Sequence, residues 1–233
     1  ENSTMLDIII SQIASKALSS NSWFVATQKL LRRYKLPPLL EIMAGNIPKE
    51  AWKSMVKKAI STHWKNSIEE EANTKSTLKH MNTTFTPGQP HLVWKSTNPS
   101  HRDVRRAHIK AKLMTGTYIL QSNRAAFNQT TDKTCPMCNG GDESIAHFIM
   151  SCPASETLRH PFIQQLHQAI PLVYQDHPRT GWSEEMSTQL VLDPTHEVIN
   201  EILPLSNAQL YQIEKISRRL CFKLHSLRAT QLG

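Results

Sequence analysis

The feature that most constrains this chain is a run of three cysteines and one histidine with the spacing C-x2-C-x8-H-x4-C. The run begins at Cys135-Pro-Met-Cys138 and continues through His147 to Cys152. Thiolate and imidazole groups are the ligands that zinc prefers, and four of them complete a tetrahedral structural site. All four positions are filled and none is a carboxylate, which favours a structural metal over a catalytic one. The sequence therefore predicts one structural Zn²⁺ ion held by Cys135, Cys138, His147 and Cys152.

The residues around the motif favour the same geometry. Gly140 and Gly141 follow the first cysteine pair, so backbone N–H groups can approach the sulfurs without a Cβ in the way. The stretch 142–144 predicts a helix start that carries His147 inward. Two alternatives remain, an ordinary core histidine at His147 and a disulfide between two cysteines. A disulfide would leave only Cys221 to pair with the third cysteine, and the printed sequence shows no signal peptide for an oxidising compartment.

Charge is unevenly distributed along the chain. Residues 1–134 hold 20 lysines and arginines against 9 acidic residues, whereas residues 135–233 hold 7 against 10. The basic excess before the motif predicts a polyanionic partner, with nucleic acid first and an acidic membrane surface second. A solvated, lysine-rich helical surface is the alternative. No apolar run approaches the length that spans a bilayer, so we expect no membrane partner.

Apolar residues recur with the period of a helix over most of the chain. The expected fold is mainly α, a helical platform with a small CCHC zinc knuckle inserted between N-terminal and C-terminal helical segments. Residues 91–94 are expected as a short strand or extended segment. Cys221 falls beside the apolar stripe of the last helix, where a small buried side chain is expected. The predicted helices cover residues 5–18, 23–34, 48–81, 101–115, 155–170, 182–192 and 207–227.

Proline, glycine and charge divide the chain into regions. The stretch 82–90 is rich in turn-forming residues and is the best linker candidate. The expected regions are an N-terminal helical region at 1–82, a linker and basic helix at 83–134, the zinc knuckle at 135–153 and a C-terminal helical tail at 154–233.

The helix over residues 101–115 is the segment that we expect to contact phosphate. Arg102, Arg106 and Lys110 fall at i, i+4 and i+8 and would form a continuous basic edge. Trp94 or Phe148 would stack on a base, as aromatic residues do in proteins that bind single strands. The predicted nucleic-acid-binding residues are Arg102, Arg105, Arg106, Lys110, Lys112 and Arg124.

Motifs of known catalytic sites are absent from the sequence. It contains no glycine-rich phosphate loop, no G-x-S-x-G elbow and no H-E-x-x-H helix. No pair of acidic residues has the context that polymerases and nucleases use to hold two metal ions, which also argues against an endonuclease. His160, His167 and His177 have no fixed spacing to other ligands. We therefore predict no catalytic residues and no small-molecule substrate for this segment.

Three stretches resemble the C-terminal region of non-LTR (LINE-type) retrotransposon reverse transcriptases. They are Ala111–Arg124, the Cys135–Cys138 pair and Glu143–Pro153. That family carries a knuckle of the form C-x2-C-x7-8-H-x4-C after its polymerase and thumb, preceded by a basic helical segment and followed by a helical tail. The similar retroviral nucleocapsid knuckle has only four residues between cysteine and histidine. The close resemblance covers about residues 100–160, and weaker similarity extends over the rest of the chain.

The resemblance implies a module that grips template RNA or target DNA during target-primed reverse transcription. The Asp-Asp box of the family's polymerase is missing, so this segment would not be an enzyme, although its parent polypeptide would be an RNA-directed DNA polymerase. Residues 1–82 would correspond to a thumb or connection region. The implied partners are RNA and/or DNA and the polymerase portion of the same polypeptide, in the nucleus and/or cytoplasm. The alternative is a zinc-stabilised protein-interaction scaffold whose apolar stripe at 207–227 docks another subunit.

Overall fold

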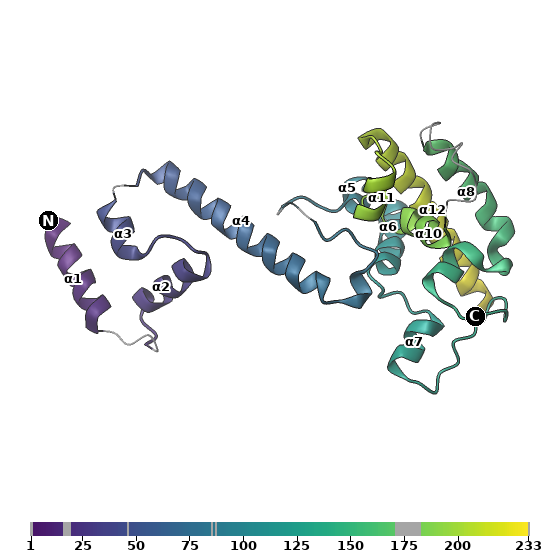
Figure 1. Cartoon of the computed structure of the whole chain (residues 1–233), viewed down its shortest axis with the longest axis horizontal. Helices are drawn as coiled ribbons and strands as arrows, with labels where there is room; N and C mark the ends of the chain where they lie inside the picture. The colour runs from purple at the N-terminus through teal and green to yellow at the C-terminus, as the bar shows by residue number, and fades with distance from the viewer. Residues whose placement is uncertain are drawn as a thin grey trace. The chain divides into compact units, whose positions relative to one another are not determined.

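The computed structural model describes residues 2–15, 20–45, 47–84, 86, 88–170 and 183–232 (Figure 1). Within these ranges the chain is mainly helical, as predicted, and no β-strand is formed. Thr134 and Asp142 make an isolated antiparallel bridge. The chain divides into two compact units, Glu1–Glu70 and Glu71–Gly233, whereas the sequence placed its first boundary at residue 82.

The first unit is formed by short helices and most of one long helix. Its elements are α1 (Asn2–Ser15), α2 (Trp23–Arg33), α3 (Leu39–Ala44) and α4 (Lys49–Asn73), the last of which continues into the second unit. The Ser22 hydroxyl caps α2, because it accepts a hydrogen bond from the N–H of Val25 at 3.3 Å. Phe24, Val25 and Leu31 are buried, so the apolar face of α2 supplies the small core of this unit. The predicted continuation of the first helix to residue 18 lies outside the described residues.

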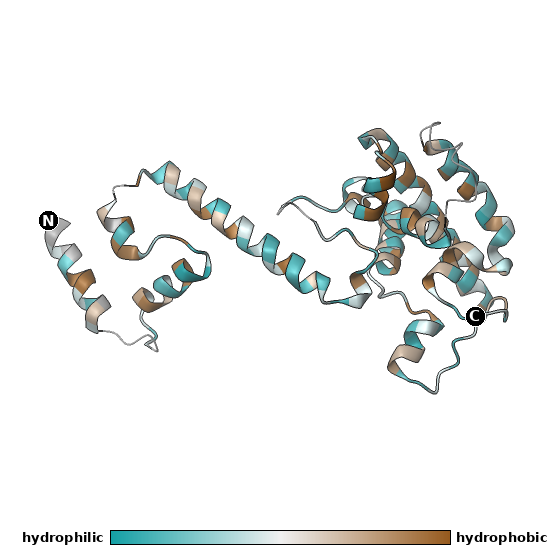
Figure 2. Ribbon diagram, in the orientation of Figure 1, coloured by the Kyte–Doolittle hydropathy of each residue, from teal (hydrophilic) through white to brown (hydrophobic). Residues whose placement is uncertain are grey.

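The second unit is a helical bundle built around its last helix. Its elements are η1 (Ser76–Leu78), α5 (Leu92–Lys95), α6 (His101–Met114), α7 (Gln121–Phe127), the π-helical turn η2 (His147–Ser151), η3 (Pro153–Ser155), α8 (Glu156–Ala169), α10 (Glu184–Leu192), α11 (Glu197–Ile202) and α12 (Asn207–Leu232). Helix α12 packs against both α6 and α8. In Figure 2 the hydrophobic colour gathers where α6, α10 and α12 meet. Phe148, Leu192, Leu220 and Leu224 are fully buried there, as is Cys221, in agreement with the sequence.

Two elements differ from the prediction. Residues 92–95 form helix α5 rather than a strand, because the His91 ring caps the first turn by accepting a hydrogen bond from the N–H of Val93 at 3.3 Å. Helix α4 ends at Asn73 rather than near residue 81. Its last turn is closed by the Thr74 hydroxyl, which donates to the carbonyl of Glu71 at 2.7 Å.

Asp193, just after α10, is hydrogen-bonded to both ends of the predicted linker at 82–90. Its buried carboxylate accepts hydrogen bonds from the N–H of Asn82 at 2.6 Å and from Nε2 of His91 at 3.1 Å. The hydroxyl of Thr195 donates to the other carboxylate oxygen at 2.7 Å. Burial by itself would raise the pKa of Asp193, but these hydrogen bonds outweigh it and lower that pKa to about 2.

Asp193 is expected to make the stability of the second unit depend on pH in acid. Its pKa falls from the ordinary 3.8 to about 2 in the folded chain. The resulting stabilisation, about 2 kcal/mol, is fully present above about pH 4 and is lost as the pH falls through about 2. The variant Asp193→Asn lacks this contribution. Its free energy of unfolding in urea should therefore fall less steeply from pH 4 to pH 2.5 than that of the unaltered chain. Parallel pH profiles for the two proteins would contradict this role of the carboxylate.

Candidate metal centre

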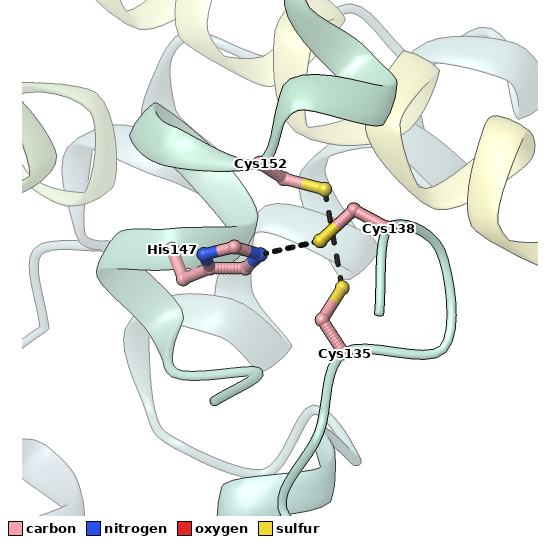
Figure 3. Close-up of side chains that lie close together, drawn as sticks. All are labelled: Cys135, Cys138, His147 and Cys152. Atoms are coloured by element: carbon pink, nitrogen blue, oxygen red, sulfur yellow. Dashed lines mark hydrogen bonds between the residues drawn. The ribbon is translucent and has the colours of Figure 1, made fainter. Parts of the chain in front are cut away.

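Cys135 and Cys138 lie on a tight turn that is closed by the Thr134–Asp142 bridge. The N–H of Cys135 donates to the carbonyl of Gly141 at 2.7 Å, and the N–H of Asn139 donates to the carbonyl of Cys135 at 2.8 Å. Asn139 has a φ of 52°, in the left-handed region that asparagine tolerates better than most residues. This turn closes the C-x2-C loop and aims both sulfurs to one side (Figure 3).

The predicted approach of a glycine N–H to a sulfur is present at Gly140. Its N–H donates to Sγ of Cys138 at 3.4 Å. A Cβ built on Gly140 would lie 3.7 Å from that sulfur, which is ordinary van der Waals contact. The hydrogen bond therefore depends on the backbone turn, and glycine itself is not required for it.

His147 and Cys152 are brought to one side by the π-helical turn η2. Residues five apart lie about 140° apart around an ordinary α-helix and would not face the same ion. Here the N–H of Cys152 donates to the carbonyl of His147 at 2.8 Å, an i→i+5 bond that widens the turn. The hydroxyl of Ser144 also accepts a hydrogen bond from the N–H of His147 at 3.1 Å. The x4 spacing of the motif is therefore matched by a π turn, which the sequence analysis did not anticipate.

The structure brings all four predicted ligands together. Their donor atoms lie within 4.8 Å of one another. Sγ of Cys135 lies 3.9 Å from Sγ of Cys152, and Sγ of Cys138 lies 3.4 Å from Nε2 of His147 (Figure 3). Neighbouring ligand atoms around a tetrahedral ion with zinc-like bond lengths are about 3.8 Å apart for two sulfurs and about 3.6 Å for sulfur and nitrogen. These four side chains, called the Cys/His cluster below, could hold a metal ion.

The cysteines of the cluster are free thiols in different surroundings. The 3.9 Å between the sulfurs of Cys135 and Cys152 is far beyond a disulfide bond of about 2.05 Å. Burial raises the pKa of Cys135, and it raises the pKa of Cys152 to about 12. Burial acts the same way on Cys138, but hydrogen bonds from the Gly140 N–H and neighbouring thiols lower its pKa overall. Buried thiols of this kind become ligands only when a cation replaces their protons.

An ion pair with a buried carboxylate connects the loop of the Cys/His cluster to α12. The Glu143 carboxylate is fully shielded from solvent and accepts hydrogen bonds from Nε and Nη2 of Arg228 at 2.6 and 2.9 Å. It also accepts a hydrogen bond from the N–H of Gln121 at 2.8 Å. Beside it, Phe148 stacks on Tyr118, with 5.6 Å between the ring centroids. The loop that carries the ligands is thereby fixed to the end of α12 and to the start of α7.

The prediction that Lys110 contacts phosphate is wrong, because this side chain is buried. Its Nζ is fully buried and donates to Oε2 of Glu214 at 2.5 Å and to the hydroxyl of Ser217 at 2.7 Å. The predicted edge of Arg102, Arg106 and Lys110 therefore becomes more buried along α6: Arg102 is exposed, Arg106 is half-buried, and Lys110 lies where α6 packs against α12. Lys110 is therefore part of the interior and does not reach a ligand in solution.

The remaining predicted basic residues lie at or near the surface. Arg106 is half-buried, whereas Arg102, Arg105 and Lys112 are exposed on α6 and Arg124 is exposed on α7. Of the two predicted stacking residues, Phe148 is fully buried in the core, which excludes a direct contact with a base, while Trp94 is 43% exposed.

Helix α12 adds an arginine that the sequence analysis did not assign to this surface. Arg219 is exposed and lies over the ring of Phe162, 5.7 Å from its centroid. Arg105 lies in the same way over Phe222 of α12, also at 5.7 Å. Burial lowers the pKa of Arg106, as does the positive charge of Arg102 and Arg219. The α6/α12 basic surface is defined here as Arg102, Arg105, Arg106, Lys112 and Arg219.

Comparison of the chain with known protein families, with curated protein sequences and with solved structures finds no match. The geometry by itself defines the class of the site as a Cys₃His cluster that could hold one metal ion. Among the described residues, no helix has both the length and the apolar character needed to cross a membrane.

Proposed function

We propose that the Cys/His cluster binds one Zn²⁺ ion that stabilises the second unit. Three sulfurs and one imidazole nitrogen suit zinc, whereas Mg²⁺ and Ca²⁺ take oxygen ligands. The protein supplies all four ligands, which leaves no open position for a substrate and supports a structural role. Burial of Cys135 and Cys152 also favours a closed site that holds its ion without exchange with solvent.

The second part of the proposal is that the α6/α12 basic surface binds nucleic acid. It rests on the crowding of like charges around Arg106, whose pKa is lowered by burial and by Arg102 and Arg219. Among the described residues only Asp103 lies within ion-pair distance of Arg106, at 3.8 Å, whereas Arg102, Arg105, Lys112 and Arg219 are exposed. Phosphate groups of RNA or DNA would supply the missing negative charge and acceptors.

The order of the parts supports the family suggested by the sequence. An exposed basic helix, a Cys/His cluster and a helical tail follow one another, as the resemblance to LINE-type reverse transcriptases implies. We propose that the chain is the non-catalytic, post-polymerase part of such an enzyme, whose parent polypeptide is an RNA-directed DNA polymerase. In that role it would grip template RNA or target DNA during target-primed reverse transcription.

The alternative of a protein-interaction scaffold required an exposed apolar stripe at residues 207–227. Ile213, Leu220 and Leu224 of the apolar stripe on α12 are fully buried inside the second unit and cannot dock a separate subunit. Large apolar side chains are instead exposed in the first unit, where Trp23 is 73% and Trp64 is 48% exposed. These residues favour a protein contact of the first unit, for which the polymerase portion of the same polypeptide is the proposed partner.

Reversing charge on the α6/α12 basic surface is expected to weaken nucleic-acid binding. The double variant Arg102→Glu with Arg105→Glu should bind a labelled 20-nucleotide RNA on the order of 30-fold more weakly, as measured by fluorescence anisotropy in 50 mM salt. The slope of log affinity against log salt should be about −4 for the unaltered chain if about five phosphates are neutralised, and it should be shallower in the variant.

The matched control places the same charge change on α4 of the first unit. Lys57→Glu with Lys58→Glu alters two exposed lysines and changes the net charge by the same amount. It should retain most of the affinity if the contact is local to α6 and α12. An equal loss in both double variants would show a response to net charge alone. Absence of RNA and DNA binding by the unaltered, metal-loaded chain would reject the proposed function.

A further inference from the structure

Phe127 at the end of α7 is exposed without a structural reason. It is 90% exposed, more than any other large apolar side chain among the described residues. Figure 1 shows α7 and the loop after it standing apart from the bundle of α6, α8, α10 and α12. Isolated apolar residues on a surface are common, but a phenylalanine that contacts almost nothing contributes little to folding. A role in binding would account for its position.

The segment that carries Phe127 is held in a defined shape. At its base, the side-chain amide of Asn123 donates to the carbonyls of Gly116 at 3.0 Å and Tyr118 at 3.1 Å. At its other end, the chain enters the Cys/His cluster at Cys135. An aromatic ring on a segment fixed at both ends loses little conformational freedom when a ligand stacks on it.

Two turns with hydrogen-bonded side chains stiffen the loop between these ends. The side-chain oxygen of Asn128 accepts hydrogen bonds from the N–H of Thr130 at 3.2 Å and from its hydroxyl at 2.8 Å. Asp132 accepts the same pair from Thr134, at 2.9 and 2.7 Å. The side chains of Asn128 and Asp132 thus form hydrogen bonds within the loop. Phe127, the last residue of α7, is followed by a loop that is ordered by its own contacts.

The segment that carries Phe127 also carries two exposed cations. Arg124 lies one helical turn before Phe127 on the same side of α7, and Lys133 follows in the loop; both are exposed. Asp132 is the only acidic residue from 115 to 134, and hydrogen bonds from Thr134 lower its pKa. An aromatic ring on a segment with two exposed cations fits a ligand that offers a flat ring next to phosphate, whereas a purely apolar protein surface would leave both cations without partners.

We propose that residues 121–134, called the α7 finger, bind an unpaired nucleic-acid strand by stacking Phe127 on a base. Arg124 and Lys133 would contact the phosphates on either side of that base. A base inside a duplex is covered on both faces by its neighbours, so the ring can stack only where the strand is single or the base is turned out. This proposal rests on the proposed function and adds to it a preference for single-stranded RNA or DNA.

The position of the α7 finger is consistent with one continuous binding path. Arg105 and Lys112 share the exposed face of α6 and are separated by about 10 Å along its axis. Lys112 lies in the last turn of α6, and α7 begins a few residues later, after the turn at Gly116. A strand bound by phosphates along α6 would therefore be led towards Phe127.

The test compares single strands with a duplex. Binding of labelled U₂₀ RNA, dT₂₀ DNA and a 20-base-pair DNA duplex would be measured by anisotropy with the metal-loaded chain. Phe127→Ala should weaken binding of both single strands about 5- to 150-fold, the range expected for one stacked base, and should change duplex binding less than about twofold. Phe127→Trp should retain single-strand binding, because tryptophan also offers a flat ring.

Ile119→Ala is the matched control. Ile119 is 59% exposed on the segment between α6 and α7, so this variant removes exposed apolar surface without removing a ring. It should leave all three affinities unchanged. Circular dichroism and the thermal midpoint of Phe127→Ala should equal those of the unaltered chain, because the ring supports little of the fold.

Three outcomes would overturn the α7 finger and leave the α6/α12 surface intact. They are unchanged single-strand binding in Phe127→Ala, an equal loss for single strands and duplex, and a dimer in light scattering that Phe127→Ala dissociates. Such a dimer would show that Phe127 contacts a second copy of the chain instead of a nucleic-acid base. Absence of any binding to the three oligonucleotides by the unaltered chain would instead reject the proposed function itself.

Discussion

Replacing Cys152 with serine is expected to abolish metal binding and to unfold much of the second unit. Structural zinc contributes about 10 kcal/mol or more to the folding of small zinc domains, which is comparable with the whole stability of a typical domain. Serine is a poor zinc ligand, and at a fully buried position it also leaves a hydroxyl in an apolar environment. The damage should spread, because Phe148 and Ile149 lie between two ligands on η2 and belong to the main core.

Metal content and amide hydrogen exchange measure this prediction. The unaltered chain should carry one zinc ion in native mass spectrometry, and Cys152→Ser should carry none. Chelation of the unaltered chain should remove exchange protection first from about residues 130–155, and added zinc should restore it.

Cys221→Ser is the matched control. It makes the same chemical change at a buried thiol outside the Cys/His cluster. Its cost should be about 1–3 kcal/mol, without loss of metal. Exchange that does not change on chelation would contradict a structural ion, and loss of zinc from the control would contradict the ligand set.

The features that could be predicted from sequence are those set by short-range spacing. The helices follow from apolar periodicity, and the caps at Ser22 and Ser100 follow from local side-chain chemistry. The four members of the Cys/His cluster lie within eighteen positions, so their residue types and spacing were enough to identify the group that the structure brings together.

Features that depend on distant contacts could not be predicted in this way. Lys110 has the same local sequence character as its exposed neighbours, and only its partners Glu214 and Ser217 on α12 make it an interior residue. The pairing of Glu143 with Arg228 likewise joins residues far apart in the chain. A helical projection of α6 shows that Lys110 and Arg105 lie on opposite faces, so both cannot face the same ligand. Without the position of α12, however, the projection does not show which of the two faces is buried.

The burial of Lys110 changes which face of α6 could contact a ligand. The face of α6 opposite Lys110 carries Arg105 and Lys112 and is exposed to solvent. Arg219 of α12 adds a further exposed cation to the α6/α12 basic surface. The buried face fixes α6 to α12 through charge as well as apolar contact, because Arg218 of α12 also pairs with Asp103 at 3.3 Å. Lys110 of α6 therefore belongs to the interior, whereas Arg105 and Lys112 remain available for the proposed contact with nucleic acid.

Lys110→Ala is expected to destabilise the second unit by about 3–5 kcal/mol. Removing one partner of a buried ion pair leaves the other charge without compensation, and that loss is much larger than the value of an exposed pair. Here Glu214 would remain buried, where burial already raises the pKa of its carboxyl group against the effect of Lys110 and Arg218. The free energy of unfolding in urea measures the effect, with the zinc concentration held constant.

Lys112→Ala and a double variant are the controls. They separate the effect of breaking a buried ion pair from the effect of removing a lysine side chain from α6. Lys112 is exposed on the same helix, so its replacement should change the free energy of unfolding by no more than about 0.5 kcal/mol. Lys110→Met combined with Glu214→Leu removes both charges and keeps apolar volume, and it should recover most of the stability lost in Lys110→Ala. Equal, small effects of Lys110→Ala and Lys112→Ala would place both ammonium groups in solvent and return Lys110 to the proposed phosphate-binding surface.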